Sequence, residues 1–149
     1  MKVIIAGGRN ISETQTLEIL NKLTGYTHYF EQFTPIKGLY LFSLKVPNRY
    51  KPKQIEFWNN VTEIVCGMAK GVDTHGEKFA KINNIPVKYF PANWNEHGKR
   101  AGFIRNAEMG DYADALILIW DGKSKGSAHM KKYAKSVGLP ILEFVVNSV

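Results

Sequence analysis

Short apolar runs alternate with longer stretches of helical periodicity along most of this chain. The runs that read as strands lie at residues 3–6, 62–66, 86–90, 115–120 and 140–146. Strands this continuously apolar are expected where helices cover both faces of a parallel sheet. The pattern therefore predicts an α/β fold, a Rossmann-like open and mostly parallel sheet of about five strands with helices on both faces.

Four helices are expected between these strands, at residues 13–23, 72–83, 99–112 and 127–137. Ser12 stands where a hydroxyl can cap the first helix, and Gly25 and Gly138 stand where glycine commonly ends one. Glu77 and Lys81 add an ion pair one turn apart on the second helix.

The length and composition fit a single domain spanning residues 1–149. With 44% hydrophobic and 22% charged residues, the chain resembles an ordinary globular protein. One cysteine allows no disulfide within the chain, and the four histidines show no metal-ligand spacing. The apolar run at residues 115–120 is too short to cross a bilayer, and the first residues lack a signal-peptide pattern. A cytoplasmic protein with no membrane partner and no bound metal is expected.

The formal net charge of the chain is +7. Such an excess fits either a nucleic-acid surface or a site for an anionic ligand together with solvated lysines. The cations are spread along the chain and form no block of five or more, which favours the small anion.

Residues 26–60 break the alternation. The segment is rich in aromatic residues and lysine and contains three prolines, and residues 39–46 could form an additional strand. It reads as an insertion in the first crossover, either an edge hairpin or a contact between copies, so a homo-oligomer is expected. Its aromatic rings beside Arg49, Lys51 and Lys53 could instead stack on nucleobases.

Three glycine-containing turns follow three of the predicted strands, at residues 6–10, 66–73 and 120–127. In an open parallel sheet, ligands bind outside the carboxyl ends of the strands, where such turns meet. Glycine lets the backbone approach an anion, and the helix after each turn directs free N–H groups to the same place. None of the turns matches the dinucleotide fingerprint or the P-loop, which disfavours an ordinary dehydrogenase or P-loop ATPase.

The ligand-binding residues expected from these turns and from the helix at 99–112 are Gly7, Gly8, Arg9, Gly67, Lys70, Gly71, Asp73, Arg105, Asn106, Asp121, Gly122, Lys123, Ser124, Gly126 and Ser127. Phosphate contacts are expected from Arg9, Lys70, Arg105 and Lys123, and from the backbone N–H groups of Gly8, Gly71, Gly126 and Ser127.

Some of these residues have a structural alternative. Asp73 can favour the dipole of its helix or contact the ligand. Asp121 can accept a ribose hydroxyl or cap a turn, and Ser127 can cap its helix as well as donate to phosphate. Trp94 and Trp120 are expected to be packing residues rather than platforms for bases.

Six motifs occur in order, and they are GGR at 7–9, GMAKGVD at 67–73, FPANW at 90–94, GKRAGFIRNAEM at 98–109, ADA at 113–115 and WDGKSKGS at 120–127. Together they resemble the YspA-like branch of the SLOG superfamily, over residues 1–12 and about 62–145. That superfamily groups the Lonely Guy cytokinin-activating enzymes, DNA-processing protein A and nucleotide-sensing domains of bacterial defence systems. The resemblance implies a Rossmann-like fold and a site for nucleotides or ADP-ribose-like derivatives.

Lonely Guy enzymes cleave an N-glycosidic bond with an arginine and a glutamate. Arg105 stands in the place of that arginine, although an arginine in mid-helix can also be a solvated residue. Met130 stands where the glutamate would be. A catalytic carboxylate would therefore have to come from Asp73, Glu108 or Asp121.

Three functions follow from these observations. The leading hypothesis is a sensor or sequestering protein for a nucleotide-derived, phosphate-bearing small molecule, ADP-ribose-like or a nucleoside phosphate, with no other cofactor. The first alternative is a nucleotide hydrolase acting on an N-glycosidic or phosphate bond. The second alternative is a DNA-binding protein, favoured by the net charge and the basic insertion.

Overall fold

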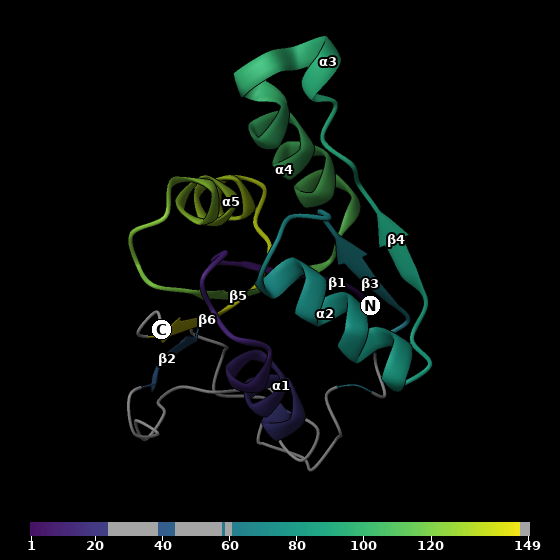
Figure 1. Ribbon diagram of the computed structural model, residues 1–149, viewed down its shortest axis with the longest axis vertical. Helices are drawn as coiled ribbons and strands as arrows, with labels where there is room; N and C mark the ends of the chain where they lie inside the picture. The colour runs from purple at the N-terminus through teal and green to yellow at the C-terminus, as the bar shows by residue number, and fades with distance from the viewer. Residues whose placement is uncertain (24–38, 44–57, 59–60, 147–149) are drawn as a thin grey trace.

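The computed structural model describes residues 1–23, 39–43, 58 and 61–146 (Figure 1). Its elements in chain order are β1 (Lys2–Gly7), α1 (Glu13–Lys22), β2 (Leu39–Ser43), β3 (Glu63–Cys66), α2 (Val72–Ile82), β4 (Val87–Tyr89), α3 (Trp94–His97), a 3-10 turn (Gly98–Arg100), α4 (Ala101–Tyr112), β5 (Ala115–Trp120), α5 (Lys125–Ser136) and β6 (Ile141–Val146). The predicted α/β fold with a parallel sheet is confirmed.

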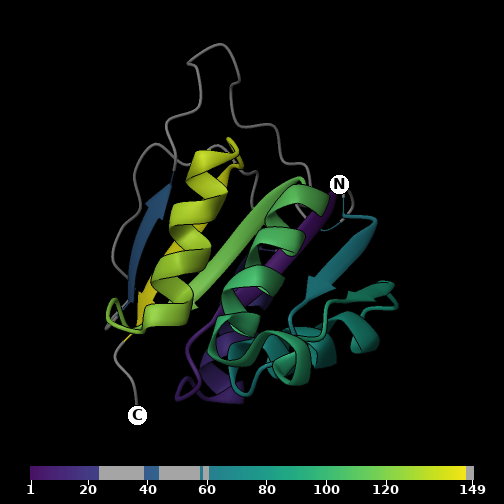
Figure 2. The same cartoon turned by 90° about the horizontal axis from the view of Figure 1, so that it is seen from above.

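Among the described residues, the sheet has six strands in the order β2-β6-β5-β1-β3-β4 (Figure 2). Five of them are parallel, and β2 pairs antiparallel with β6 at one edge. The chain runs outward from β1 to β3 and β4, then crosses back to β5 on the other side of β1. This reversal leaves a crevice at the carboxyl ends of β1 and β5, the usual ligand position in open α/β sheets.

Successive residues of the central strands enter two separate cores. Ile5 packs on the face covered by α1 and α2, beside Phe79. Ile4 packs on the face covered by α4 and α5, beside Met109 and Met130. Both faces of the sheet are thus buried at its centre, which is why β1 and β5 are apolar at nearly every position.

The start of α1 follows the sequence expectation. The Ser12 hydroxyl accepts a hydrogen bond from the Gln15 N–H at 3.1 Å, and the Gln15 side chain accepts one from the Ser12 N–H at 3.1 Å. These two bonds form a capping box, which satisfies two of the N–H groups that a helix start leaves free.

The start of α5 and the presence of α3 differ from the sequence expectation. The helix α5 begins at Lys125, two residues early, so its N-cap is Ser124 and Ser127 lies inside the first turn. The reason is the turn before it, because the Asp121 carboxylate accepts the N–H groups of Lys123 and Ser124 and turns the chain into the helix. The four-residue helix α3 was not predicted, since it is too short to show a helical period.

The insertion expected at residues 26–60 lies outside the described residues, apart from β2 and Trp58. Its basic aromatic region and the stop of the first helix at Gly25 fall in that undescribed part. The additional strand is confirmed at 39–43. In the described part of the chain, no helix combines the length and the apolar character needed to cross a membrane.

Candidate functional site

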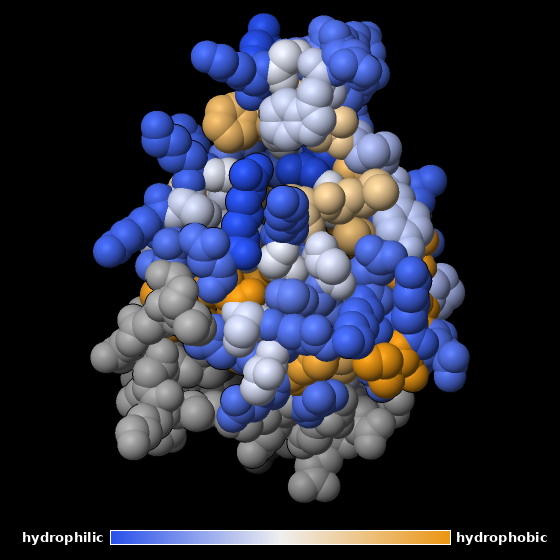
Figure 3. All heavy atoms as spheres, in the orientation of Figure 1, coloured by the Kyte–Doolittle hydropathy of each residue, from blue (hydrophilic) through white to orange (hydrophobic). Residues whose placement is uncertain are grey.

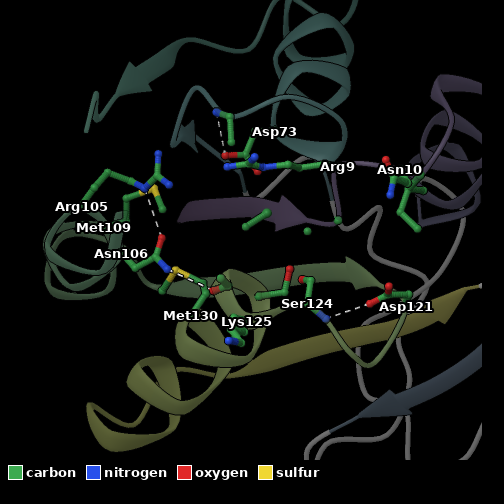
Figure 4. A pocket seen from close by; sticks show the side chains of 17 residues that line it. Arg9, Asn10, Asp73, Arg105, Asn106, Met109, Asp121, Ser124, Lys125 and Met130 are labelled. Atoms are coloured by element: carbon green, nitrogen blue, oxygen red, sulfur yellow. Dashed lines mark hydrogen bonds between the residues drawn. The ribbon is translucent and has the colours of Figure 1, made fainter. Parts of the chain in front are cut away.

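A cavity of about 350 Å³ opens at the carboxyl ends of β1 and β5. It is lined by residues of all three glycine-containing turns and of α4: Ala6, Gly7, Gly8, Arg9, Asn10, Ile11, Ala69, Asp73, Arg105, Asn106, Met109, Asp121, Ser124, Lys125, Gly126, Ser127 and Met130. Figure 4 shows Arg9, Asp73 and Arg105 on one side of this cavity, with Ser124 and Lys125 on the other. We call it the polar cavity.

A second cavity of about 560 Å³ shares part of its lining with the first. Both are lined by Arg9, Ala69, Arg105, Asn106 and Gly126. The second cavity reaches the start of α4 and the helix α3, and its remaining lining residues are Gly67, Met68, Lys70, Pro91, Ala92, Trp94, Lys99, Gly102 and Phe103. We call it the aromatic cavity. Figure 3 shows the face onto which the strands end, with hydrophilic side chains across its middle.

The first turn of α5 presents hydrogen-bond donors to the polar cavity. The backbone N–H groups of Gly126 and Ser127 come before the first N–H that the helix itself uses, which is that of Ala128 bonding to the Ser124 carbonyl. The Ser127 side chain is only 5% exposed, and its hydroxyl has no hydrogen-bond partner among the described residues. A buried hydroxyl without a partner is costly, so this group is suited to a ligand oxygen.

Arg9 and Lys125 are cations of this site that have no carboxylate partner in the part of the chain that the structure describes. Arg9 lies in the turn after β1 and lines both cavities, and Lys125 lies at the start of α5. Both side chains are exposed. Their charge adds to the positive end of the α5 dipole, which makes the polar cavity attractive to an anion.

Arg105 is held by neutral oxygens rather than by a carboxylate. Its Nη1 donates to the Gly67 carbonyl, and its Nε donates to Asn106 Oδ1 at 3.2 Å. No carboxylate of the described residues lies within ion-pair distance of it. The guanidinium is therefore fixed in direction while its charge is left for a ligand.

Asn106 connects α4 to the first turn of α5. Its Oδ1 accepts from Arg105, while its Nδ2 donates to the Gly126 carbonyl at 3.2 Å and lies 3.2 Å from His129 Nδ1. Asn106 is buried, and a buried amide needs these partners. Its side chain thus sets the position of the arginine relative to the α5 amides.

Asp73 is the buried carboxylate of the polar cavity. It is 5% exposed, and its Oδ2 accepts from the Ala69 N–H at 3.3 Å. Burial raises the pKa of the Asp73 carboxyl to about 6, although the Arg105 guanidinium and the Ala69 N–H limit the rise. A carboxyl with this pKa can carry or release a proton near neutral pH.

The structure brings most of the expected site residues together. Ten of them line the polar cavity, namely Gly7, Gly8, Arg9, Asp73, Arg105, Asn106, Asp121, Ser124, Gly126 and Ser127. Gly67 and Lys70 line the aromatic cavity. Gly71, Gly122 and Lys123 line neither.

Three expected roles need correction. The Gly8 N–H donates to the Ile119 carbonyl at 2.9 Å, continuing the β1–β5 ladder, so it is not free for a phosphate. Gly71 is required by the backbone, since its φ is +83° and a Cβ there would lie 2.3 Å from the Gly8 carbonyl oxygen. Ser127 does not cap α5, because the helix begins before it.

The tryptophan expectation is half right. Trp120 is buried and donates through Nε1 to the Glu143 carboxylate at 2.8 Å, as a packing residue would. Trp94, in contrast, is 55% exposed and lines the aromatic cavity, because the short helix α3 lies beyond the two helix layers. Phe103 and Lys99 were also not singled out as ligand contacts, since nothing in the turn pattern marks them.

The three carboxylates considered as catalytic groups lie in different surroundings. Glu108 is exposed and lines neither cavity, whereas Asp73 and Asp121 line the polar cavity. The backbone N–H of Lys123, with that of Ser124, lowers the pKa of Asp121, which therefore has a turn-capping role. Met130 is 1% exposed and packs in the core while touching the cavity. Within the described ranges, His, Cys, Asp and Glu form no group of three that could hold a metal.

Comparison with known proteins gives one sequence relative. The Gene 61 protein of Mycobacterium phage D29 is 32% identical over 87 residues, which cover 54% of this chain and 70% of the phage protein. No family model matches the chain. No solved structure matches it either.

Proposed function

This chain belongs to the same family as the Gene 61 protein of Mycobacterium phage D29, and we propose that it binds a phosphate-bearing nucleotide derivative as a sensor or sequestering protein. The phosphate occupies the polar cavity, against the first turn of α5. The ligand class is a nucleoside phosphate or an ADP-ribose-like molecule, in line with the motif resemblance to SLOG domains.

The strongest support is the Ser127 hydroxyl. It is buried, lacks a partner among the described residues and lines the same cavity as the free Gly126 N–H. The Gly126 N–H is a donor and the Ser127 hydroxyl can act as one. Arg9, Arg105 and Lys125 line the same cavity. A phosphate oxygen accepts from such a set through charge-assisted hydrogen bonds.

The carboxylates of the polar cavity fit the sugar rather than the phosphate. Asp73 and Asp121 accept hydrogen bonds from backbone N–H groups, and a carboxylate oxygen has a second lone pair that can accept from a further donor. A ribose hydroxyl can donate to such an oxygen, whereas a phosphate would be repelled by it. A sugar phosphate satisfies both halves of this mixed lining.

The test is direct binding with the purified full chain. Calorimetric titration with AMP, ADP-ribose, ribose 5-phosphate and inorganic phosphate should show binding of at least one organic phosphate, with no product after overnight incubation. Ser127→Ala should weaken that affinity about tenfold, the effect of losing one charge-assisted hydrogen bond. The control Ser136→Ala, at the far end of α5, should bind like the parent chain. Absence of binding by every phosphate would contradict the proposal.

Hydrolysis is the second candidate, favoured by the position of Asp73. An ionised carboxylate beside a fixed arginine can take a proton from water as the water oxygen bonds to ribose C1′. The C1′–N bond breaks as this C1′–O bond forms, and the departing base takes the proton from Asp73, which returns to the carboxylate. The pKa of about 6 leaves Asp73 mostly ionised at pH 7.5.

Product analysis separates the two candidates. Release of adenine or inorganic phosphate from AMP or ADP-ribose would identify an enzyme, and Asp73→Asn should then abolish turnover while AMP still binds. Intact ligand after prolonged incubation, together with measurable affinity, would leave binding as the function.

A further inference from the structure

We infer that the aromatic cavity holds the base of the ligand, with Trp94 as the stacking platform that determines specificity. The inference rests on the proposed function, since it assumes a phosphate in the polar cavity. In this orientation, the phosphate lies against the first turn of α5 and the sugar lies at the residues that the two cavities share. The base then lies beside α3.

Trp94 is placed and held as a platform rather than as a core residue. It is the first residue of α3, and the Asn93 side chain caps this helix by accepting from the Glu96 N–H at 3.1 Å. The indole is 55% exposed. A Cβ on Gly102 would lie 3.6 Å from Trp94 Cη2, so the indole lies close to α4 where that helix has no side chain.

Phe103 gives the aromatic cavity a second ring. Phe103 is 45% exposed, and its ring stacks on that of His129, with ring centroids 4.3 Å apart and an interplanar angle of 24°. Burial lowers the pKa of His129, and the nearby Lys132 adds to the effect. A neutral imidazole then supports the phenyl ring, so both aromatic side chains are held by the fold before a ligand arrives.

The rest of the lining argues for a charged aromatic ligand rather than for a protein surface. Lys70, Lys99 and Arg9 accompany Trp94 and Phe103 around this cavity. Stacking of bases on aromatic side chains next to basic groups is the usual chemistry of nucleotide-binding surfaces. A lining with this many cations would be costly to bury against an apolar partner.

The two cavities are joined at residues that suit the middle of a nucleotide. Arg105 and Asn106 line both, and they are fixed to each other by a hydrogen bond of 3.2 Å. Gly126 lines both as well, and a Cβ built there meets no atom within 4 Å. A ligand can therefore pass from one cavity to the other, and a sugar phosphate without a base would leave the aromatic cavity unfilled.

The test compares AMP and ADP-ribose with ribose 5-phosphate in calorimetric titrations of the full chain. At least one of the two nucleotides should bind about tenfold more tightly than ribose 5-phosphate, the lower end of what one stacked base contributes. Trp94→Ala should remove this advantage and leave ribose 5-phosphate affinity within about twofold, while Trp94→Phe should restore most of it. Quenching of tryptophan fluorescence by the nucleotide should disappear in Trp94→Phe.

Ile82→Ala is the matched control, because Ile82 is also an exposed apolar residue but lines neither cavity. It should leave every affinity unchanged. Equal binding of ribose 5-phosphate and both nucleotides, or an unchanged ratio in Trp94→Ala, would overturn the base platform and leave the phosphate site standing. Failure of all three compounds to bind would overturn the proposed function together with this inference.

Discussion

The Asp73 carboxylate and the Arg105 guanidinium both lie beside the position that a Cβ on Gly67 would occupy. A Cβ on that glycine would lie 2.8 Å from Asp73 Oδ2 and 2.9 Å from Arg105 Nη1. No larger residue fits there without moving one of the two charged groups. The glycine of the second turn thus allows a buried acid and a fixed arginine to line the same cavity.

Replacement of Asp73 by Asn should change how stability depends on pH. The folded-state pKa of about 6 is above the ordinary value of 3.8, so folding favours the protonated acid. This contribution is fully present below about pH 4 and is lost as the pH rises through about 6. Between those limits, the parent chain should lose on the order of 3 kcal/mol of unfolding free energy relative to Asp73→Asn.

Urea denaturation at half-unit steps from pH 4 to pH 7.5 measures this difference. The unfolding free energies of the two proteins should diverge between about pH 4 and pH 6 and run parallel from there to pH 7.5. Curves that stay parallel throughout would mean that Asp73 has the same pKa in the folded and unfolded chains.

Arg105→Lys should weaken AMP binding about tenfold or more although the charge is kept. The planar guanidinium donates to the Gly67 carbonyl and to Asn106 at once, and a single ammonium cannot reproduce that geometry. The misplaced ammonium should lose one charge-assisted hydrogen bond to the ligand. Such a loss costs about 1.5–3 kcal/mol, which corresponds to a tenfold or larger loss of affinity. Titration calorimetry gives the value, and Arg100→Lys, an exposed residue outside both cavities, is the control. Equal losses in both variants would argue against a directed role for Arg105.

The architecture could be predicted because its determinants are local and repeated. Continuous apolar strands such as Ala115–Trp120 and helix signals such as Ser12 indicate a parallel sheet without any long-range information. The helix α3 could not be found this way, because its four residues make about one turn and the helical period cannot repeat within them. The early start of α5 depends on a turn made by the Asp121 side chain, which glycine counting does not reveal.

The candidate site could be predicted only at the level of its turns. The sequence shows that glycines and cations follow the strands. It does not show which backbone groups already form hydrogen bonds within the sheet, as the Gly8 N–H does. It also does not show that Trp94 remains exposed, since that depends on where α3 lies relative to the helix layers. The missed residues are those whose role comes from tertiary placement.

Ser12→Ala should lower the unfolding free energy by about 1 kcal/mol, the usual cost of losing an N-cap hydroxyl. The hydroxyl accepts the Gln15 N–H at 3.1 Å in the capping box of α1. Thr14→Ala serves as the control, because Thr14 is exposed in the same turn and should change stability by less than about 0.5 kcal/mol. Urea denaturation of both variants at constant pH measures the difference, and a Ser12 variant as stable as the parent would show that the cap contributes nothing.

Gly126→Leu should abolish AMP binding without unfolding the protein. Gly126 is in the first turn of α5 and lines both cavities, and a Cβ there meets no atom within 4 Å. A leucine side chain therefore meets no obstacle in the fold, and at a position that lines both cavities we expect it to exclude the ligand. Because glycine is a poor helix former, the change should also raise the unfolding free energy, by up to about 1 kcal/mol. Titration calorimetry and urea denaturation of the same sample give the AMP affinity and the unfolding free energy.

Gly138→Leu is the control for specificity, since Gly138 ends α5 with a φ of +78° and lines neither cavity. This change should destabilise the fold and leave AMP affinity unchanged. Retained AMP binding in Gly126→Leu would place the ligand away from the first turn of α5.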